Sequence, residues 1–277
     1  MNILIVDGNE KNASSRYTEM NMMTQYEIYE KVLRDLIKKD CNITILHPAC
    51  AGNYIPQGVN LDDFQGIVWT GSLLNIYDLG PAIERQIELA KELFKKENKI
   101  FGSCWGLQVL AVAAGGTVRK NPKGLEAVIA NNIVINSEGM KHPLYKNKPR
   151  IFDSLCWHYD EVKNLPSGTT VLSSNEMSDI QSMVFTRDKS EIWGVQYHPE
   201  FDPGWISGLM QQRKKLLLEE GIYLNSEEFD KFSSFFASIE KNDDKKNQLS
   251  ISETIINRKT HTVELSNWLK NFMSVFD

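Results

Sequence analysis

The sequence lacks several features that mark common protein classes. Its four cysteines, Cys41, Cys50, Cys104 and Cys156, lie far apart and form no C-x-x-C pair, so we expect neither structural disulfides nor a cysteine-based metal site. Basic residues are not in excess, because 31 lysines and arginines stand against 36 acidic residues and the net charge is −5. We therefore expect no nucleic-acid partner and favour a small neutral or zwitterionic substrate.

The sequence also has no long hydrophobic run, and we expect no secretory leader. The chain opens with MNILIVDG, an apolar run that reaches Asp7 without a basic segment or a small-residue cleavage site. The longest stretch without charge, 100–118, is interrupted by glycines and polar residues, which indicates a buried strand, turn and helix rather than a membrane span. We expect a cytoplasmic protein with no membrane partner.

The first half of the sequence alternates strand-like and helix-like segments. Hydrophobic residues make up 42% of the chain, enough for a substantial core. This alternation predicts a doubly wound α/β fold with a mostly parallel, flavodoxin-like sheet and helices on both faces. We expect a long polar loop after the first strand, strands at 2–6, 43–46, 67–69 and 99–103, and helices at 25–39, 82–96 and 105–114.

The second half has a different pattern. Turns separate short strand candidates, some of which should pair antiparallel at the sheet edge, at 126–135, 151–157, 170–174, 180–186 and 192–197. After Pro203 the composition is helical, with helices expected at 205–220, 226–239 and 263–272 and a charged loop at 241–246. We therefore expect a main domain over residues 1–204 and a helical extension over residues 205–277 that packs on it and helps to define the substrate.

A candidate nucleophile stands between a predicted strand and a predicted helix, in the segment Gly102-Ser103-Cys104-Trp105-Gly106. This G-x-C-x-G pattern is typical of a nucleophile elbow, a sharp turn in which the flanking glycines avoid clashes of a Cβ atom. Cys104 would then lie at a helix N-terminus, which favours the thiolate. The alternative is that Cys104 is one more small buried hydrophobic residue, as lone cysteines usually are.

A candidate base stands where another predicted strand ends, in the segment GVQYHPE at 194–200. Of the five histidines, His198 alone has a suitable context, because Glu200 lies two residues away and on the same side of an extended chain. Glu200 can orient the imidazole while its other nitrogen serves Cys104, as in a Cys-His-acid triad. His-Pro-Glu alone is a weak signal, since many surface turns contain it.

Together the two motifs resemble the class I (triad) glutamine amidotransferase family, whose elbow reads G-x-C-x-G-x-Q and whose base motif reads G-V-Q-x-H-P-E. The resemblance extends to Gln108, to AGGTV at 114–118 and to WHYDEV at 157–162, and covers roughly residues 1–202. The chain departs from the family pattern at 70–73, where TGSL stands for S-G-G-P. This variant is similar to stand-alone relatives of the glutaminase domain of GMP synthetase.

The resemblance implies a mechanism. The Cys104 thiolate attacks a γ-carboxamide, His198 protonates the departing ammonia or amine, and water releases glutamate from a γ-glutamyl thioester. Backbone N–H groups of Gly71 or Ser72 and of Trp105 would form the oxyanion hole. No cofactor and no metal are expected.

The resemblance also implies a place for the substrate's glutamyl part. Its α-amino and α-carboxylate groups would be held by Gln108 and by the segment around His158 and Tyr159. His158 as a second base is a less favoured alternative to His158 as a wall residue.

Two further segments carry charged residues. The polar loop 9–23 ends the first strand, at the edge where open α/β sheets bind ligands, so Arg16 and Tyr17 are candidates to reach the substrate. A surface loop without that role is an equal alternative. The run Arg213, Lys214 and Lys215 lies opposite three leucines on a predicted helix, and we interpret it as a solvated face.

Three functions are compatible with the sequence. The first is a glutaminase subunit that feeds ammonia to a separate synthase subunit, because the chain has no P-loop and no S-G-G-x-D-S loop to activate an acceptor itself. The second function is a self-sufficient hydrolase of γ-glutamyl amides or peptides. The third is a silent binding module, against which the intact Cys104, His198 and Glu200 argue. The sequence does not indicate the oligomeric state.

Overall fold

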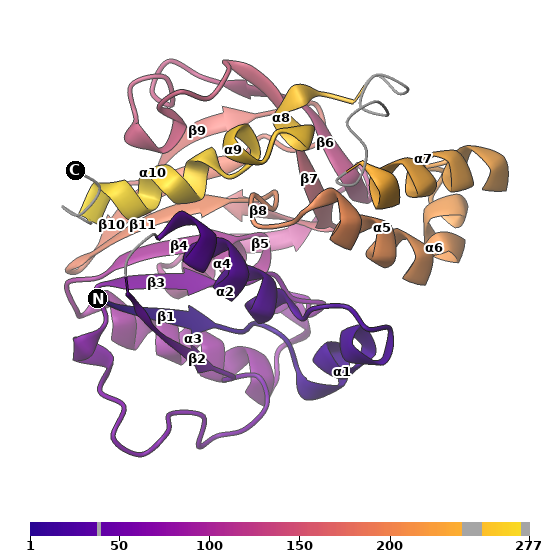
Figure 1. Cartoon of the computed structure of the whole chain (residues 1–277). Coiled ribbons are helices and arrows are strands. Elements are labelled where there is room, and N and C mark those ends of the chain that lie inside the picture. The colour runs from indigo at the N-terminus through magenta and orange to yellow at the C-terminus, as the bar shows by residue number, and fades with distance from the viewer. Residues whose placement is uncertain (38–39, 240–250, 273–277) are drawn as a thin grey trace.

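A nine-stranded sheet forms the centre of the molecule (Figure 1). The computed structural model describes residues 1–37, 40–239 and 251–272. Neighbouring strands are parallel in the order β2 (Asn42–Leu46), β1 (Asn2–Val6), β3 (Gly66–Trp69), β4 (Lys99–Ser103) and β11 (Ser190–Val195). The sheet continues antiparallel through β10 (Ser182–Arg187), β9 (Thr170–Ser174), β6 (Glu126–Ile135) and β7 (Ile151–His158). The predicted α/β fold with antiparallel edge strands is confirmed.

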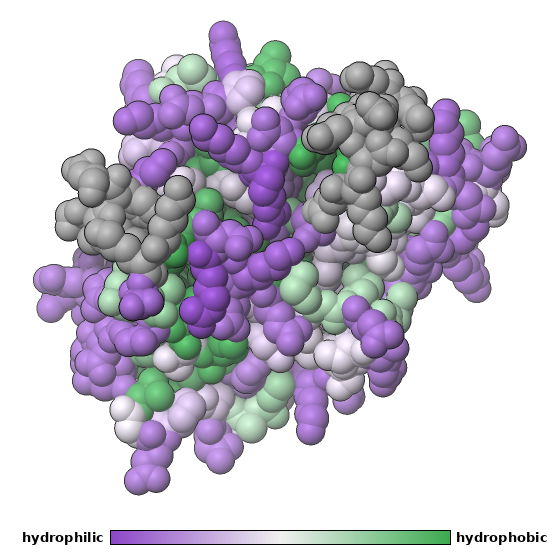
Figure 2. All heavy atoms as spheres, in the orientation of Figure 1, coloured by the Kyte–Doolittle hydropathy of each residue, from purple (hydrophilic) through white to green (hydrophobic). Residues whose placement is uncertain are grey.

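Both faces of the parallel strands are covered, which explains their continuous hydrophobic sequence. On β1, Ile3 and Ile5 join the core beneath α2 (Gln25–Leu36). The alternate residues of that strand join the opposite core, beneath α3 (Pro81–Phe94) and α4 (Trp105–Ala113). Hydrophilic residues cover most of the outer surface in Figure 2, with hydrophobic residues visible in patches between them. Among the described residues, no helix is both long enough and apolar enough to cross a membrane.

Several short elements were not predicted. The expected polar loop after β1 contains α1 (Lys11–Glu19), in which Tyr17 alone is buried. A separate two-stranded sheet pairs β5 (Thr117–Lys120) with β8 (Asp160–Asn164). Neither α1 nor β5 has a regular alternation of apolar residues, because each is mostly exposed, so hydrophobic periodicity could not reveal them.

The C-terminal part packs on the main sheet in two places. The helices α5 (Pro203–Gln212), α6 (Lys214–Glu219) and α7 (Ser226–Ser238) form a group near the end of β7, and α5 contacts α1. The helices α8 (Glu253–Ile256), α9 (Arg258–His261) and α10 (Val263–Phe272) cross the sheet on the face of α2 (Figure 1). The Trp268 ring of α10 lies 6.0 Å from that of Phe101 on β4. The single helix predicted at 205–220 is instead two helices that meet at Arg213. The predicted loop at 241–246 lies outside the described residues.

Candidate active site

Cys104 lies in a strained turn between β4 and α4. Its backbone has φ of 51° and ψ of −105°, a conformation that residues other than glycine rarely adopt. A Cβ atom on Gly102 would lie 2.6 Å from the carbonyl carbon of Gly106, and one on Gly106 would lie 2.5 Å from the carbonyl oxygen of Trp69. Both flanking positions therefore require glycine, and Cys104 stands in a sharp turn between a strand and a helix.

The thiol of Cys104 is buried, and burial disfavours the thiolate. Burial raises its pKa to about 12, an effect that the backbone N–H of Trp105 opposes and the Glu200 carboxylate reinforces. Its Sγ donates a hydrogen bond to the carbonyl oxygen of Trp157 at 3.6 Å. The helix N-terminus thus acts in the expected direction, but burial outweighs it and favours the thiol over the thiolate. A nearby base must take its proton during any reaction.

The imidazole of His198 is held in place by a buried carboxylate. Its Nδ1 lies 2.7 Å from Oε1 of Glu200, and its ring stacks on Phe201 with ring centres 3.8 Å apart. Ser103 Oγ donates to the same Glu200 oxygen at 2.9 Å, and Tyr29 donates to Ser103 at 2.7 Å. Because a carboxylate only accepts, Nδ1 carries the proton of the neutral ring and Nε2 keeps a free lone pair.

The two motifs meet at the carboxyl ends of adjacent parallel strands. Ser103 on β4 pairs with Val195 on β11, and the backbone N–H of Cys104 donates to the Val195 carbonyl at 2.8 Å. Gly71, which follows β3 at the same edge, lies against the imidazole of His198. A Cβ atom on Gly71 would stand 2.7 Å from Cε1 of that ring. The sheet topology therefore brings together the ends of β3, β4 and β11, as expected for ligand sites in open α/β sheets.

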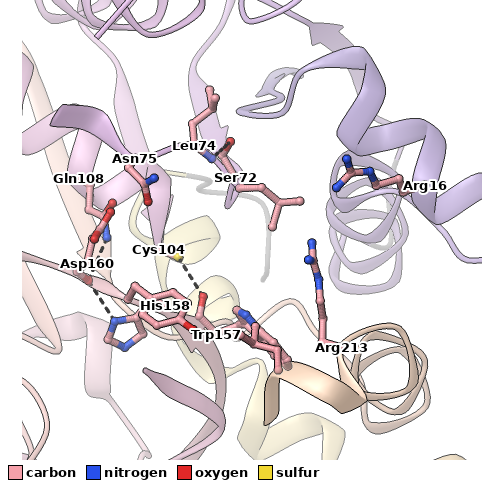
Figure 3. Close-up of a pocket in the computed structure, with 13 residues that line it drawn as sticks. Arg16, Ser72, Leu74, Asn75, Cys104, Gln108, Trp157, His158, Asp160 and Arg213 are labelled. Carbon is pink, nitrogen blue, oxygen red and sulfur yellow. Dashed lines mark hydrogen bonds between the residues drawn. The ribbon is translucent and has the colours of Figure 1, made fainter. Parts of the chain in front are cut away.

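A cavity of about 390 Å³ opens in front of Cys104. One end is lined by Gln108 and Asp160, and the other by Arg16 and Arg213 (Figure 3). Gln108 Nε2 donates to the carbonyl oxygen of Asp160 at 3.2 Å. The two ends therefore differ in charge: a carboxylate lies at one, two guanidinium groups at the other, and the thiol lies between them.

His158 lines this cavity but has no free nitrogen. Its Nδ1 lies 3.0 Å from the carbonyl oxygen of Asp160 and its Nε2 lies 2.8 Å from Oε2 of Glu126. Burial works to raise the pKa of Glu126, but hydrogen bonds from His158, Asn175 and Gln181 together hold it below its ordinary value. Both imidazole nitrogens therefore lie within hydrogen-bond distance of oxygen atoms of the protein, and the ring forms part of the cavity wall.

Four of the six positions considered for an oxyanion hole and for glutamyl binding line the cavity, whereas Gly71 and Trp105 are not among its lining residues. Ser72, Gln108, His158 and Tyr159 line the cavity with Cys104. The described ranges contain no group of three or more His, Cys, Asp or Glu side chains able to hold a metal ion.

Comparison with known proteins shows the family of this chain. The sequence model of the family described as "Glutamine amidotransferase class-I" matches residues 24–211. The chain belongs to the class I glutamine amidotransferase family. A γ-glutamyl-L-1-hydroxyisopropylamide hydrolase from a Pseudomonas species is 33% identical over 227 residues, covering 80% of this chain and 75% of the relative.

Other relatives of this glutamine amidotransferase have related names. A glutamine-hydrolyzing GMP synthase subunit from Methanocaldococcus jannaschii is 30% identical over 138 residues, covering 50% of this chain and 65% of the relative. Gamma-glutamyl peptidase 5 of Arabidopsis thaliana is 26% identical over 167 residues, covering 60% of this chain and 65% of the peptidase. The protein is thus an enzyme of the glutamine amidotransferase type.

A solved structure supports the fold over almost the whole chain. A glutamine amidotransferase from Thermotoga maritima matches with a TM-score of 0.68 and 18% sequence identity, covering 98% of this chain and 97% of the other. At this identity the likeness shows the fold alone.

The interpretation of Arg213 as part of a solvated face is wrong. Lys214 and Lys215 do pair at the surface with Asp230 and Glu219, but Arg213 is half-buried and lines the cavity of this amidotransferase. The reason is the break between α5 and α6, where Arg213 has φ of −113° and ψ of 18°. The sequence continues helical in composition across the break, so no signal marks it.

The two candidates from the first polar segment have different fates. Arg16 lines the cavity, as considered. Tyr17, however, is buried away from it, with its ring 5.5 Å from that of Trp205 on α5. Adjacent residues of α1 point in different directions, so only one of the pair reaches the site.

Proposed function

We propose that the protein is a self-sufficient hydrolase of γ-glutamyl amides, of which glutamine is the simplest. The observation that carries this proposal is the cavity, which extends from Cys104 both toward Gln108 and toward Arg16 (Figure 3). Its volume of about 390 Å³ lies within the range of roughly 300–1,000 Å³ typical of small-molecule sites. An enzyme that releases only ammonia needs room for the glutamyl group alone. The part of the cavity that extends toward Arg16 gives additional room for a substituted amine.

The proposed reaction uses Cys104, His198 and Glu200 as a triad. Cys104 Sγ attacks the carbonyl carbon of the γ-amide while Nε2 of His198 takes the thiol proton. His198 then gives this proton to the departing amine or ammonia as the C–N bond breaks, and a γ-glutamyl thioester remains. Water attacks the thioester, with the same nitrogen as its base, and glutamate leaves as the thiol is restored. Glu200 keeps Nε2 free for both transfers by accepting the Nδ1 proton.

Backbone groups complete the proposed site. N–H groups of Gly71 or Ser72 and of Trp105 would stabilise the oxyanion, because they lie at strand and helix ends beside the thiol. Gln108 and the backbone at His158 and Tyr159 would hold the α-amino and α-carboxylate groups of the glutamyl moiety.

The domain boundary and the location are part of this proposal. Residues 1–204 would form the catalytic domain, and residues 205–277 an extension that completes the cavity through Arg213 and Leu216. The four cysteines are free thiols, which favours the reducing cytoplasm.

A second candidate is a glutaminase subunit that delivers ammonia to a separate synthase subunit. The observation in its favour is the 30% identity to the GMP synthase subunit from Methanocaldococcus jannaschii. Under this alternative, glutamine would be the preferred substrate and a partner would raise its hydrolysis.

The test is glutamate release by the purified single chain from glutamine and a panel of N-substituted γ-glutamyl amides. Faster steady-state turnover of substituted amides than of glutamine would support the hydrolase. Turnover of glutamine alone would favour the glutaminase subunit. No glutamate from any substrate would contradict both candidates.

A further inference from the structure

Two arginines converge on one end of the cavity from different parts of the chain. Arg16 comes from α1 and Arg213 from the junction of α5 and α6, and their guanidinium groups point toward each other across the cavity (Figure 3). They lie on the side of Cys104 opposite to Gln108 and Asp160. The fold therefore builds a positively charged end into the cavity.

Neither guanidinium has an ion-pair partner among the described residues. Within residues 1–37, 40–239 and 251–272, no carboxylate forms an ion pair with Arg16 or Arg213, and neither side chain donates a hydrogen bond there. Glu220 accepts a hydrogen bond from Tyr159, which lines the cavity. Two guanidinium groups that face each other repel, and an anion between them would remove this repulsion. A carboxylate suits this place, because guanidinium groups bind carboxylates with paired hydrogen bonds.

The position of this end relative to the thiol determines which part of a substrate reaches it. Under the proposed function, the glutamyl group occupies the end at Gln108, and its γ-carbonyl lies at Cys104. The amine part of the amide then extends toward Arg16 and Arg213. Glutamine and neutral alkyl amides have no group to place there, whereas an amine part with a carboxylate would satisfy both cations.

We propose that Arg16 and Arg213 form a subsite for a carboxylate on the amine part, so that the preferred substrates are γ-glutamyl amino acids or short γ-glutamyl peptides. This inference rests on the proposed function, and it assigns a specificity-determining role to the C-terminal extension. Arg213 lies in that extension and reaches the cavity because the helix breaks there.

The test compares two substrates that differ almost solely in the carboxylate: γ-glutamylglycine and γ-glutamylethylamide. We expect the parent enzyme to have the higher kcat/KM for γ-glutamylglycine. In Arg213→Gln or Arg16→Gln, the ratio of the two kcat/KM values should fall about tenfold or more, mainly through KM, because a charge-assisted hydrogen bond is lost. Arg213→Lys should keep part of the preference.

Lys215→Gln is the matched control. Lys215 lies two residues from Arg213, but its side chain is 89% exposed, so the ratio should not change. A parent enzyme without preference for γ-glutamylglycine would overturn the inference. Equal losses on both substrates in the arginine variants would also overturn it, because the arginines would then bind the glutamyl part or act on the fold.

A binding measurement separates failure of the inference from failure of the proposed function. If the parent hydrolyses neither substrate, the proposed function fails, and calorimetric binding of γ-glutamylglycine to Cys104→Ala then tests the subsite alone. We expect affinity to fall about tenfold or more when Arg213→Gln is added. Unchanged affinity would overturn the subsite.

Discussion

At the residue scale, the candidate triad depends on how one buried carboxylate is held. Oε1 of Glu200 accepts hydrogen bonds from both His198 and Ser103, and Ser103 accepts one from Tyr29. Ser103 is the variable position of the G-x-C-x-G pattern, yet it connects the elbow to the carboxylate of the second motif. Ser103 is therefore a positioning residue for Glu200 as well as a part of β4.

Replacing Ser103 should affect the chemical step more than substrate binding. Ser103→Ala removes one donor to a buried carboxylate, so we expect kcat to fall about tenfold with KM nearly unchanged. Steady-state kinetics with glutamate detection would measure both. Tyr29→Phe leaves the Ser103 hydroxyl in place and should have a smaller effect. Equal changes in kcat and KM for Ser103→Ala would contradict a positioning role.

Also at the residue scale, His261 on α9 makes stability depend on pH. Burial, with nearby Lys148 and Arg258, lowers its pKa to about 3, whereas in an unfolded chain it is about 6.5. Between these values the unfolded state binds the proton and the folded state does not, so stability should fall as the pH drops from about 6.5 toward 3. One such group contributes at most about 1.4 kcal/mol per pH unit.

Chemical unfolding of His261→Gln at pH 7 and pH 5 would measure this contribution. We expect the variant to lose less free energy of unfolding than the parent over this interval, because glutamine does not titrate. The same loss in both proteins would show that other groups cause the acid sensitivity.

At the scale of elements, close packing in the turn between β4 and α4 explains why Gly102 and Gly106 are glycines. A side chain on Gly106 would overlap the Trp69 carbonyl, whereas a Cβ atom on Gly52 would have no neighbour within 4 Å. Gly106→Ala should therefore lower the free energy of unfolding by about 1–3 kcal/mol and distort the Cys104 turn. Gly52→Ala is the control and should be nearly neutral. Urea unfolding measures both, and equal stability of the two variants would contradict the packing argument.

How far the sequence predicts the elements depends on whether they are buried. The bounds of β1, β4, β6 and β9 agree with the predicted ranges because hydrophobic pattern and turn residues both mark them. The exposed helix α1 has one buried residue, so its sequence shows no periodic pattern of hydrophobic residues. The break at Arg213 lies within a stretch of continuous helical composition, so the sequence pattern does not mark it.

The same reasoning explains what the sequence predicts of the candidate site. Cys104 and His198 stand in short motifs, because a strained turn and an adjacent bend each require particular neighbours. Arg16 and Arg213 are contributed by separate helices, and their approach depends on tertiary structure. Charge in a sequence shows that a residue is ionised, but it does not show which cavity the side chain enters.

At the scale of the whole molecule, a buried ion pair joins the C-terminal helices to the segment that precedes β7. Lys148 Nζ lies 3.0 Å from Oε1 of Glu264 on α10, and both side chains are fully buried. The Tyr197 hydroxyl donates to the same carboxylate at 2.8 Å. Burial lowers the pKa of Lys148, and Glu264 opposes this effect. Removing one partner would leave the other charge buried without compensation.

We expect Glu264→Leu to lower the free energy of unfolding by about 3–5 kcal/mol, since it leaves the Lys148 ammonium unpaired. Adding Lys148→Met should recover most of this loss, because the pair is then replaced by apolar groups. Denaturant unfolding of the parent, the single variants and the double variant forms a complete cycle. Additive losses would contradict a direct interaction across the two parts of the chain.

The central claim is that Cys104 is the nucleophile and His198 its base, and covalent labelling tests it most directly. A glutamine-analogue diazo-ketone should modify one cysteine per chain, and peptide mapping should place the adduct on Cys104. Labelling should be much slower in His198→Ala, because burial keeps the thiol protonated without its base. An adduct on Cys41, Cys50 or Cys156, or labelling at the parent rate in His198→Ala, would contradict the account.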